Sequence, residues 1–282
     1  MKDYLHHTFS PADKELISVI DELPLWAAPF GMKLLEAIKL KKGIIALDVG
    51  CGLGFPLIEV AQRLGVSSKV IGIDPWKEAI ECCEQKIKKY DIKNAQVIEG
   101  VAEQMPFENN YFDLIISNNG INNVEDMQKS LAECWRVSKP GAQFVFTMNL
   151  EETMIEFYNV LEEVLKAKEL HNEIQKMKDQ IHSKRKPVEE VKTLLINSGF
   201  KISGIHPDSF SINFLNGTTM FNHSLIKYWF LGGWKNILND DDLEEVFDQI
   251  ENKLNEKALE KGELQLTIPF VTVDSIKKQS DT

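Results

Sequence analysis

The chain has 282 residues, of which 43% are hydrophobic and 27% are charged, and its formal net charge is −11. This composition excludes collagen-like, low-complexity and wholly disordered chains. The negative charge repels phosphate backbones, so we expect no nucleic-acid partner. No uncharged apolar stretch approaches the roughly 20 residues that cross a bilayer, and no apolar signal region opens the chain. We therefore expect a cytoplasmic protein without a membrane span.

The four cysteines have no CxxC pair and no extracellular spacing. They are Cys51, Cys82, Cys83 and Cys134. Adjacent cysteines on a helix point to different sides, so we expect no structural disulfide and a reducing compartment. The sequence has no metal-binding motif, and we predict no metal.

Two helices are predicted before residue 43. Ser10 is suited to cap the first helix, with Pro11 at the first helical position and Asp13 completing a capping-box pattern. The second is the apolar segment Leu25–Ile38, which a basic run follows.

From Gly43 onward, short apolar runs alternate with helical patterns. The predicted strands are Ile44–Val49, Val70–Ile73, Ala95–Ile98, Leu114–Ser117 and Phe144–Met148. The helices between them include Leu57–Leu64, Glu78–Tyr90 and Met127–Val137. Nearly continuous apolar strands that alternate with helices indicate a parallel sheet buried on both faces. Because crossovers are right-handed, this order predicts a doubly wound α/β sheet.

After Asn149 the alternation stops. Further helices are predicted around Met154–Leu165, from Pro187 to Gly199, over Thr218–Phe230 and over Asp241–Glu260, with strands over Ile202–Leu215 and Leu264–Val273. No flexible linker separates the two halves. We therefore predict a single domain built from an N-terminal helical lid segment (1–42), a ligand-binding core (43–150) and the rest of the sheet with helical insertions (151–282).

The most informative segment is Asp48-Val-Gly-Cys-Gly-Leu-Gly54, where a buried strand runs into three glycines and then a helix. Such glycines let a ligand approach the backbone, and the helix that follows offers free N–H groups. The spacing is G-x-G-x-G. The third glycine of the dinucleotide pattern G-x-G-x-x-G would fall on Phe55, so that pattern fails.

The second strand ends in Asp74, 24 residues beyond Gly50. In a doubly wound sheet this carboxylate is next to the glycine-rich turn, where it can accept hydrogen bonds from both hydroxyls of a ribose. Asp74 alone is also explained as a cap of the helix Glu78–Tyr90, and it can serve both purposes.

Five motifs in register carry a resemblance to a known family. They begin at Asp48, Gly72 (Gly-Ile-Asp), Gly100 (Gly-Val-Ala-Glu-Gln-Met-Pro-Phe), Phe112 (Phe-Asp-Leu-Ile-Ile-Ser-Asn) and Trp135 (Trp-Arg-Val-Ser-Lys-Pro-Gly). The chain resembles the class I S-adenosylmethionine-dependent methyltransferases, in particular the small-molecule branch with the ubiquinone/menaquinone-type (methyltransferase type 11) domain. The resemblance covers Gly43–Phe146 and implies a mostly parallel, seven-stranded Rossmann-like sheet with an added helical lid.

The resemblance also implies a set of cofactor-binding residues. Gly50, Gly52 and Gly54 would pass beneath the methionine and ribose, with Asp48 near the amino group and Asp74 on the ribose hydroxyls. Ala102 and Glu103 would flank the adenine, and Asn118 would lie near the transferable methyl. Cys51 and Pro75, which adjoin these residues, complete the predicted set. Relatives often carry an acid where this chain has Val101, and Glu103 is our predicted replacement. Lys139-Pro140-Gly141 is predicted to form a turn before the fifth strand.

These features predict methyl transfer to a small-molecule acceptor by in-line displacement, in which positioning provides most of the acceleration. A lid with Phe30, Tyr228 and Trp229 would exclude water and contact an apolar or flat acceptor. His6, His7, His206 and His223 could act as a base, but each alone is equally explained by surface exposure or packing. We therefore assign no catalytic residue.

Three alternatives remain from the sequence. One is an NAD-dependent oxidoreductase, which the position of Phe55 disfavours. Another is a catalytically silent cofactor-binding protein, for which Val101 is the only indication. The third is an arsenite methyltransferase that would use the cysteines. Their positions disfavour it, because Cys51 belongs to the glycine-rich motif and the other three lie on predicted helices. The acceptor and the oligomeric state are not predicted.

Overall fold

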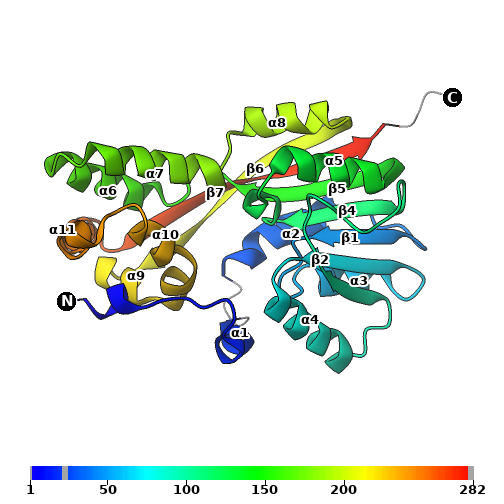
Figure 1. Ribbon diagram of the computed structural model, residues 1–282, viewed down its shortest axis with the longest axis horizontal. Coiled ribbons are helices and arrows are strands. Elements are labelled where there is room, and N and C mark those ends of the chain that lie inside the picture. Colours follow the sequence, from blue (N-terminus) through cyan, green and yellow to red (C-terminus); the bar gives the residue numbers. More distant parts are fainter. Residues whose placement is uncertain (1, 21–24, 279–282) are drawn as a thin grey trace. The chain divides into compact units, whose positions relative to one another are not determined.

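The computed structural model describes residues 2–20 and 25–278, and its seven strands form one sheet in the order β3-β2-β1-β4-β5-β7-β6 (Figure 1). The strands are β1 (Ile45–Val49), β2 (Lys69–Asp74), β3 (Ala95–Glu99), β4 (Phe112–Asn118), β5 (Ser138–Asn149), β6 (Phe200–Phe214) and β7 (Leu264–Lys277). Strands β1 to β5 pair in parallel, and β7 runs antiparallel to β5. The predicted Rossmann-like α/β class is confirmed.

The chain divides into two compact units. The sheet unit, which contains β1 to β5, comprises Pro11–Asn149, Pro187–Asp208 and Phe270–Thr282. The helical unit comprises Met1–Ser10, Leu150–Lys186 and Ser209–Pro269. Strands β6 and β7 contribute residues to both units. The predicted single domain and the boundaries 1–42, 43–150 and 151–282 stay a prediction.

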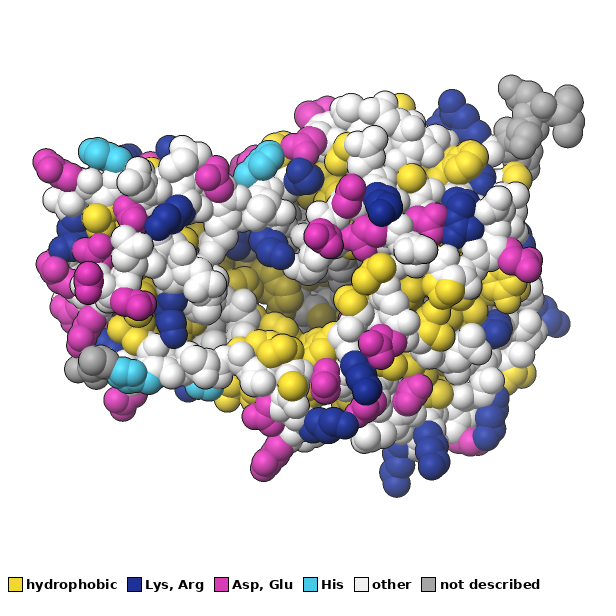
Figure 2. Space-filling model, viewed as in Figure 1, with side chains coloured by type: hydrophobic (Ala, Val, Ile, Leu, Met, Phe, Trp, Pro, Cys, Tyr) yellow, Lys and Arg dark blue, Asp and Glu magenta, His cyan; other side chains and the backbone are white. Residues whose placement is uncertain are grey.

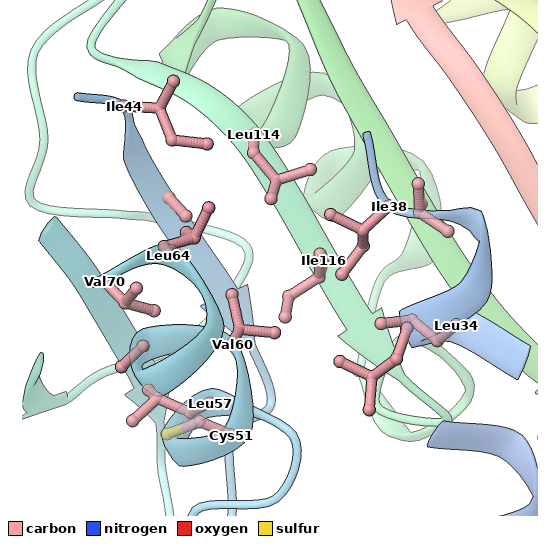
Figure 3. Packing of buried hydrophobic residues seen from close by; sticks show 14 of the residues in the cluster. Leu34, Ile38, Ile44, Cys51, Leu57, Val60, Leu64, Val70, Leu114 and Ile116 are labelled. Carbon is pink, nitrogen blue, oxygen red and sulfur yellow. The ribbon is translucent and has the colours of Figure 1, made fainter. Parts of the chain in front are cut away.

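The helices of the sheet unit cover a core that the apolar strands predict. They are α1 (Lys14–Ile20), α2 (Ala27–Ala37), α3 (Leu57–Leu64), α4 (Lys77–Lys89), the short turn η2 (Ile121–Asn123), α5 (Met127–Val137) and α8 (Val188–Asn197). Figure 3 shows Leu34 of α2 and Leu57 of α3 in one buried cluster with Val70 and Leu114. Leu47 and Ile115, which point to the opposite face of the strands, are also fully buried. Burial on both faces explains the continuous apolar runs.

The helical unit has its own aromatic core. Its helices are η1 (Asp3–His6), α6 (Ile155–Ala167), α7 (His171–Lys184), α9 (Gly217–Asn222), the π-helical turn η3 (Ile226–Phe230), α10 (Leu231–Lys235) and α11 (Asp240–Lys261). The rings of Phe157 and Trp234 stack with centroids 3.8 Å apart. Tyr4 stacks on Phe221 at 4.8 Å and donates a 2.7 Å hydrogen bond to the buried Glu251. Much of the aromatic content outside β1–β5 is therefore core packing.

Three local predictions were wrong. Helix α1 begins at Lys14, because the carboxylate of Asp13 accepts the Leu16 N–H at 3.0 Å and takes the capping role predicted for Ser10. The segment Thr218–Phe230 is not one helix, since α9 ends at Asn222 and η3 follows. The residues 139–141 do not form a turn before β5 but lie inside it, where the pairing with β4 is irregular.

On the face shown in Figure 2 acidic and basic side chains are interspersed, and apolar side chains gather in patches between them. Within residues 2–20 and 25–278, no helix is long and apolar enough to cross a membrane. The four cysteines are free thiols. The cytoplasmic location stays a prediction.

Candidate functional site

The glycine-rich loop leaves β1 at the carboxyl end of the strands and is fastened to the neighbouring strand. The N–H groups of Gly50 and Cys51 donate to the Ile73 carbonyl of β2 at 2.9 and 3.3 Å, and the Gly54 N–H donates to the Cys51 carbonyl at 2.9 Å. All three glycines have positive φ angles, from +47° to +103°. Such angles are strained for residues with a Cβ, so the loop depends on its glycines.

Gly54 and Gly52 differ in what lies beside them. A Cβ on Gly54 would lie 2.7 Å from the Cys83 sulfur of α4, so the packing beneath the loop excludes one. A Cβ on Gly52 would meet no atom within 4 Å. Gly52 therefore has open space beside it, where a ligand can approach the backbone.

Asp74, at the end of β2, holds this loop. One carboxylate oxygen accepts the Gly52 N–H at 2.9 Å, and the other accepts the Trp76 N–H at 2.9 Å. Helix α4 begins at Lys77 with Trp76 as its N-cap, and no side chain caps it, so the predicted capping role of Asp74 was wrong. Each oxygen keeps a further lone pair for a ligand hydroxyl. Pro75 continues the chain directly from this carboxylate.

Asp48 is a fully buried acid with neither carboxylate oxygen hydrogen-bonded among the described residues. Burial and the nearby negative charge of Asp74 raise its pKa to about 8. Burial also raises the pKa of Asp74. No lysine or arginine contributes to either pKa. The loop therefore has two neighbouring acids, and the ammonium of Lys86, which donates to the Leu53 carbonyl of the loop at 2.6 Å, is not among the groups that shift the pKa of either acid.

Asn118, at the end of β4, is fixed by two elements. Its amide nitrogen donates to the Ala27 carbonyl of α2 at 3.1 Å, and its amide oxygen accepts from the Thr147 hydroxyl of β5 at 2.9 Å. The next turn reaches the glycine loop, because a Cβ on Gly50 would lie 3.1 Å from the Gly120 Cα. The structure thus joins the ends of β1, β2 and β4 at one edge of the sheet.

The two residues predicted to flank an adenine are Ala102, which is buried, and Glu103, which is hydrogen-bonded within the chain. Ala102 is buried, whereas Val101 is 44% exposed. One oxygen of Glu103 accepts the N–H groups of Glu125 and Asp126 at 2.8 and 3.1 Å, just before α5. This oxygen is therefore committed to the turn before α5, which the sequence did not reveal.

The structure brings the predicted loop residues, Asp48, Asp74 and Asn118 to one end of the sheet, and it directs Glu103 toward α5. Sequence reasoning missed Thr147, Gly120 and the Ser117 hydroxyl, which donates to the Val49 carbonyl at 2.7 Å. For Ser117 and Gly120 the signal was the polar run of residues 117–120 after an apolar strand, whereas Thr147 lies inside an apolar run and gave no signal.

The predicted candidate bases are distributed over both units. His206 belongs to the sheet unit, and His6, His7 and His223 belong to the helical unit. Burial and the Lys227 ammonium lower the pKa of His7 and of His223. In the part of the chain that the structure describes, no group of three metal-ligating side chains is present.

The fold and the glycine-loop site define the chain as a Rossmann-like α/β protein. Proteins of this class bind their ligands at the carboxyl ends of the parallel strands. A family described as a methyltransferase domain matches residues 40–199, which is more than half of the chain. The chain therefore belongs to the methyltransferase domain family. This confirms the family that the five motifs indicate and decides against the oxidoreductase alternative.

Curated relatives agree with this assignment. A demethylmenaquinone methyltransferase from a Geobacillus species is 36% identical over 123 residues, which are 44% of this chain and 53% of that protein. The protein of the same name from Geobacillus stearothermophilus is 35% identical over 124 residues, again 44% and 53%. The chain thus spans about half the length of the curated relatives that it matches.

Solved structures share the fold. The YcgJ protein from Bacillus subtilis superposes with a TM-score of 0.59 at 17% identity, covering 90% of this chain and 99% of that one. A SAM-dependent methyltransferase from Aquifex aeolicus has a TM-score of 0.50 at 22% identity, covering 71% and 93%. These likenesses support the fold.

Proposed function

We propose that this chain transfers a methyl group from S-adenosylmethionine to a small-molecule acceptor. The observation that carries the proposal is the acid pair Asp48 and Asp74 at an open glycine loop, where no lysine or arginine shifts the pKa of either acid. S-adenosylmethionine carries two positive charges, on its ammonium and its sulfonium. It also has ribose hydroxyls, from which a carboxylate can accept hydrogen bonds. The family match supplies independent support.

The residues present fit this cofactor. The open space beside Gly52 admits a ligand to the backbone, and Asp74 has lone pairs to spare for the ribose. Gly50, Cys51 and Gly54 shape the loop. Asp48, enclosed without a hydrogen-bond partner and with a pKa of about 8, would act on the cofactor through its charge when the cationic ligand favours its ionised form. Ala102 and the uncommitted oxygen of Glu103 would flank the adenine.

The cofactor supplies, when bound, a methyl group already activated by a positively charged sulfur. The chain's own task is then to hold the acceptor in line with that methyl and to keep water out. Orientation of this kind is worth on the order of 7–11 kcal/mol in favourable cases. Asn118, held on both sides of its amide, is the residue we propose to border the transfer point.

The first acceptor class to test is a reduced quinone, because the curated relatives are demethylmenaquinone methyltransferases. A quinol must lose a proton when its ring carbon or oxygen is methylated, so this class also needs a proton acceptor. The chain itself offers histidines, but none is assigned to this role.

Calorimetry with S-adenosylmethionine and S-adenosylhomocysteine tests the cofactor, and transfer of tritiated methyl to a small-molecule library tests the reaction. We expect micromolar binding and a higher melting temperature with either ligand. Binding without transfer to any acceptor would favour the catalytically silent alternative. Absence of binding would refute the proposed function.

A further inference from the structure

Helix α2 contains a glycine in its interior, Gly31, although glycine destabilises helix interiors relative to alanine. Its φ angle lies outside the left-handed region, so the backbone does not require glycine. The reason is a contact with Phe55: a Cβ at position 31 would lie 2.2 Å from the Cε1 of that ring and 2.5 Å from its Cζ. The absence of a side chain at Gly31 therefore leaves the space that the Phe55 ring occupies.

Phe55 directly follows the last glycine of the cofactor loop and is still 38% exposed. A Cβ at position 31 would also lie 3.3 Å from the amide nitrogen of Asn118. The ring is thus held between the glycine loop and the end of β4, on the side of the loop where we place the transfer point.

Helix α2 is a firm support for this ring. It contacts β4 and β5 (Figure 1), and Phe30, the residue before Gly31, is fully buried against Phe270 with ring centroids 4.8 Å apart. The Asn118 amide fastens its first turn. A ring fixed in this way keeps its exposed face in one orientation, and the ordered side chain loses little further entropy when a ligand covers it.

We infer that Phe55 contacts the acceptor and selects one with a flat aromatic ring, with Gly31 as the positioning residue that sets where the ring stands. This inference rests on the proposed function. Aromatic faces pair favourably with other aromatic rings in stacked or edge-on arrangements beyond the area that they bury. A saturated acceptor of the same size lacks that contribution, so the site distinguishes the two.

The test compares two diols on the protein saturated with S-adenosylhomocysteine, by calorimetry under nitrogen. The probes are naphthalene-1,4-diol and its saturated counterpart, decahydronaphthalene-1,4-diol. The variant is Phe55→Leu, which keeps an apolar side chain. The matched control is Tyr90→Leu, which removes a 60% exposed aromatic ring after the C-terminal end of α4.

We expect the aromatic diol to bind the wild type, and Phe55→Leu to weaken it by about tenfold, the factor that corresponds to one aromatic pair. The saturated diol should bind both proteins equally weakly, and Tyr90→Leu should change nothing. S-adenosylhomocysteine affinity should be the same in all three proteins.

Several results would overturn the inference alone: no binding of the aromatic diol to the wild type, equal affinity for wild type and Phe55→Leu, or a loss confined to S-adenosylhomocysteine, which would assign the ring to the cofactor. If the wild type failed to bind S-adenosylhomocysteine, the proposed function itself would be wrong.

Discussion

Asp48→Asn should make the ligand-free protein more stable at neutral pH while weakening its cofactor binding. The carboxyl is fully buried, has no hydrogen-bond partner among the described residues and has a pKa of about 8. In the unfolded chain its pKa is near 4. Between these two values the native state binds more protons than the unfolded state, so this group makes stability fall as pH rises from about 4 to about 8.

The size of the effect follows from the two pKa values. At pH 7 the native carboxyl stays mostly protonated while the unfolded chain ionises it, and at 1.36 kcal/mol for each pKa unit this difference lowers the free energy of unfolding by about 4 kcal/mol. Asparagine has nearly the same shape and no charge. The stability gain from Asp48→Asn should therefore grow by about 3 kcal/mol between pH 5.5 and pH 8.

Urea unfolding of the ligand-free protein at several pH values measures this directly. Asp91→Asn is the control, because Asp91 is exposed and its left-handed backbone conformation also suits asparagine. Parallel stability curves for wild type and Asp48→Asn would refute the reasoning, since Asp48 would then not be the group that titrates. Calorimetry should show weaker S-adenosylmethionine binding to Asp48→Asn, because a cationic ligand favours the ionised form of Asp48 and asparagine cannot ionise.

The remaining predictions concern the loop and α2. Asp74→Ala should weaken cofactor binding by about 10- to 100-fold, since a charge-assisted hydrogen bond contributes roughly 1.5–3 kcal/mol, and equal calorimetric affinity would contradict the ribose assignment. Gly52→Val should abolish cofactor binding while circular dichroism shows a folded protein, because the added side chain fills the open space beside the loop; unchanged binding would mean that the loop is not the cradle. Gly31→Ala should lower the melting temperature of the wild type but not of Phe55→Ala, where the clashing ring is gone, and additive effects in this double-mutant cycle would contradict the contact. Amide hydrogen exchange in residues 25–42 should slow when S-adenosylhomocysteine binds, and exchange that slows only in the glycine loop would argue against the lid role of this segment.

Local sequence patterns determined the sheet and the identity of the ligand loop. The apolar runs predicted β1, β2, β4 and β5 because strands buried on both faces leave no room for polar alternation. The three glycines predicted a loop with positive φ angles, since this requirement is a property of each residue by itself. The place of Asp74 beside that loop followed from strand order, because neighbouring parallel strands end at the same edge.

Tertiary structure decided two kinds of feature. One is the choice between residues that suit the same local role equally well, and the other is the contact between segments far apart in the sequence. Ser10 and Asp13 both suit an N-cap, and only the Asp13 carboxylate reaches a helical N–H. Glu103 accepts N–H groups more than 20 residues away, a partner choice that no local pattern contains. Gly31 looks like an unfavourable residue in a helix until the fold places the Phe55 ring against it. Composition and periodicity report what each segment prefers, whereas contacts between remote segments depend on packing, which only the folded chain fixes.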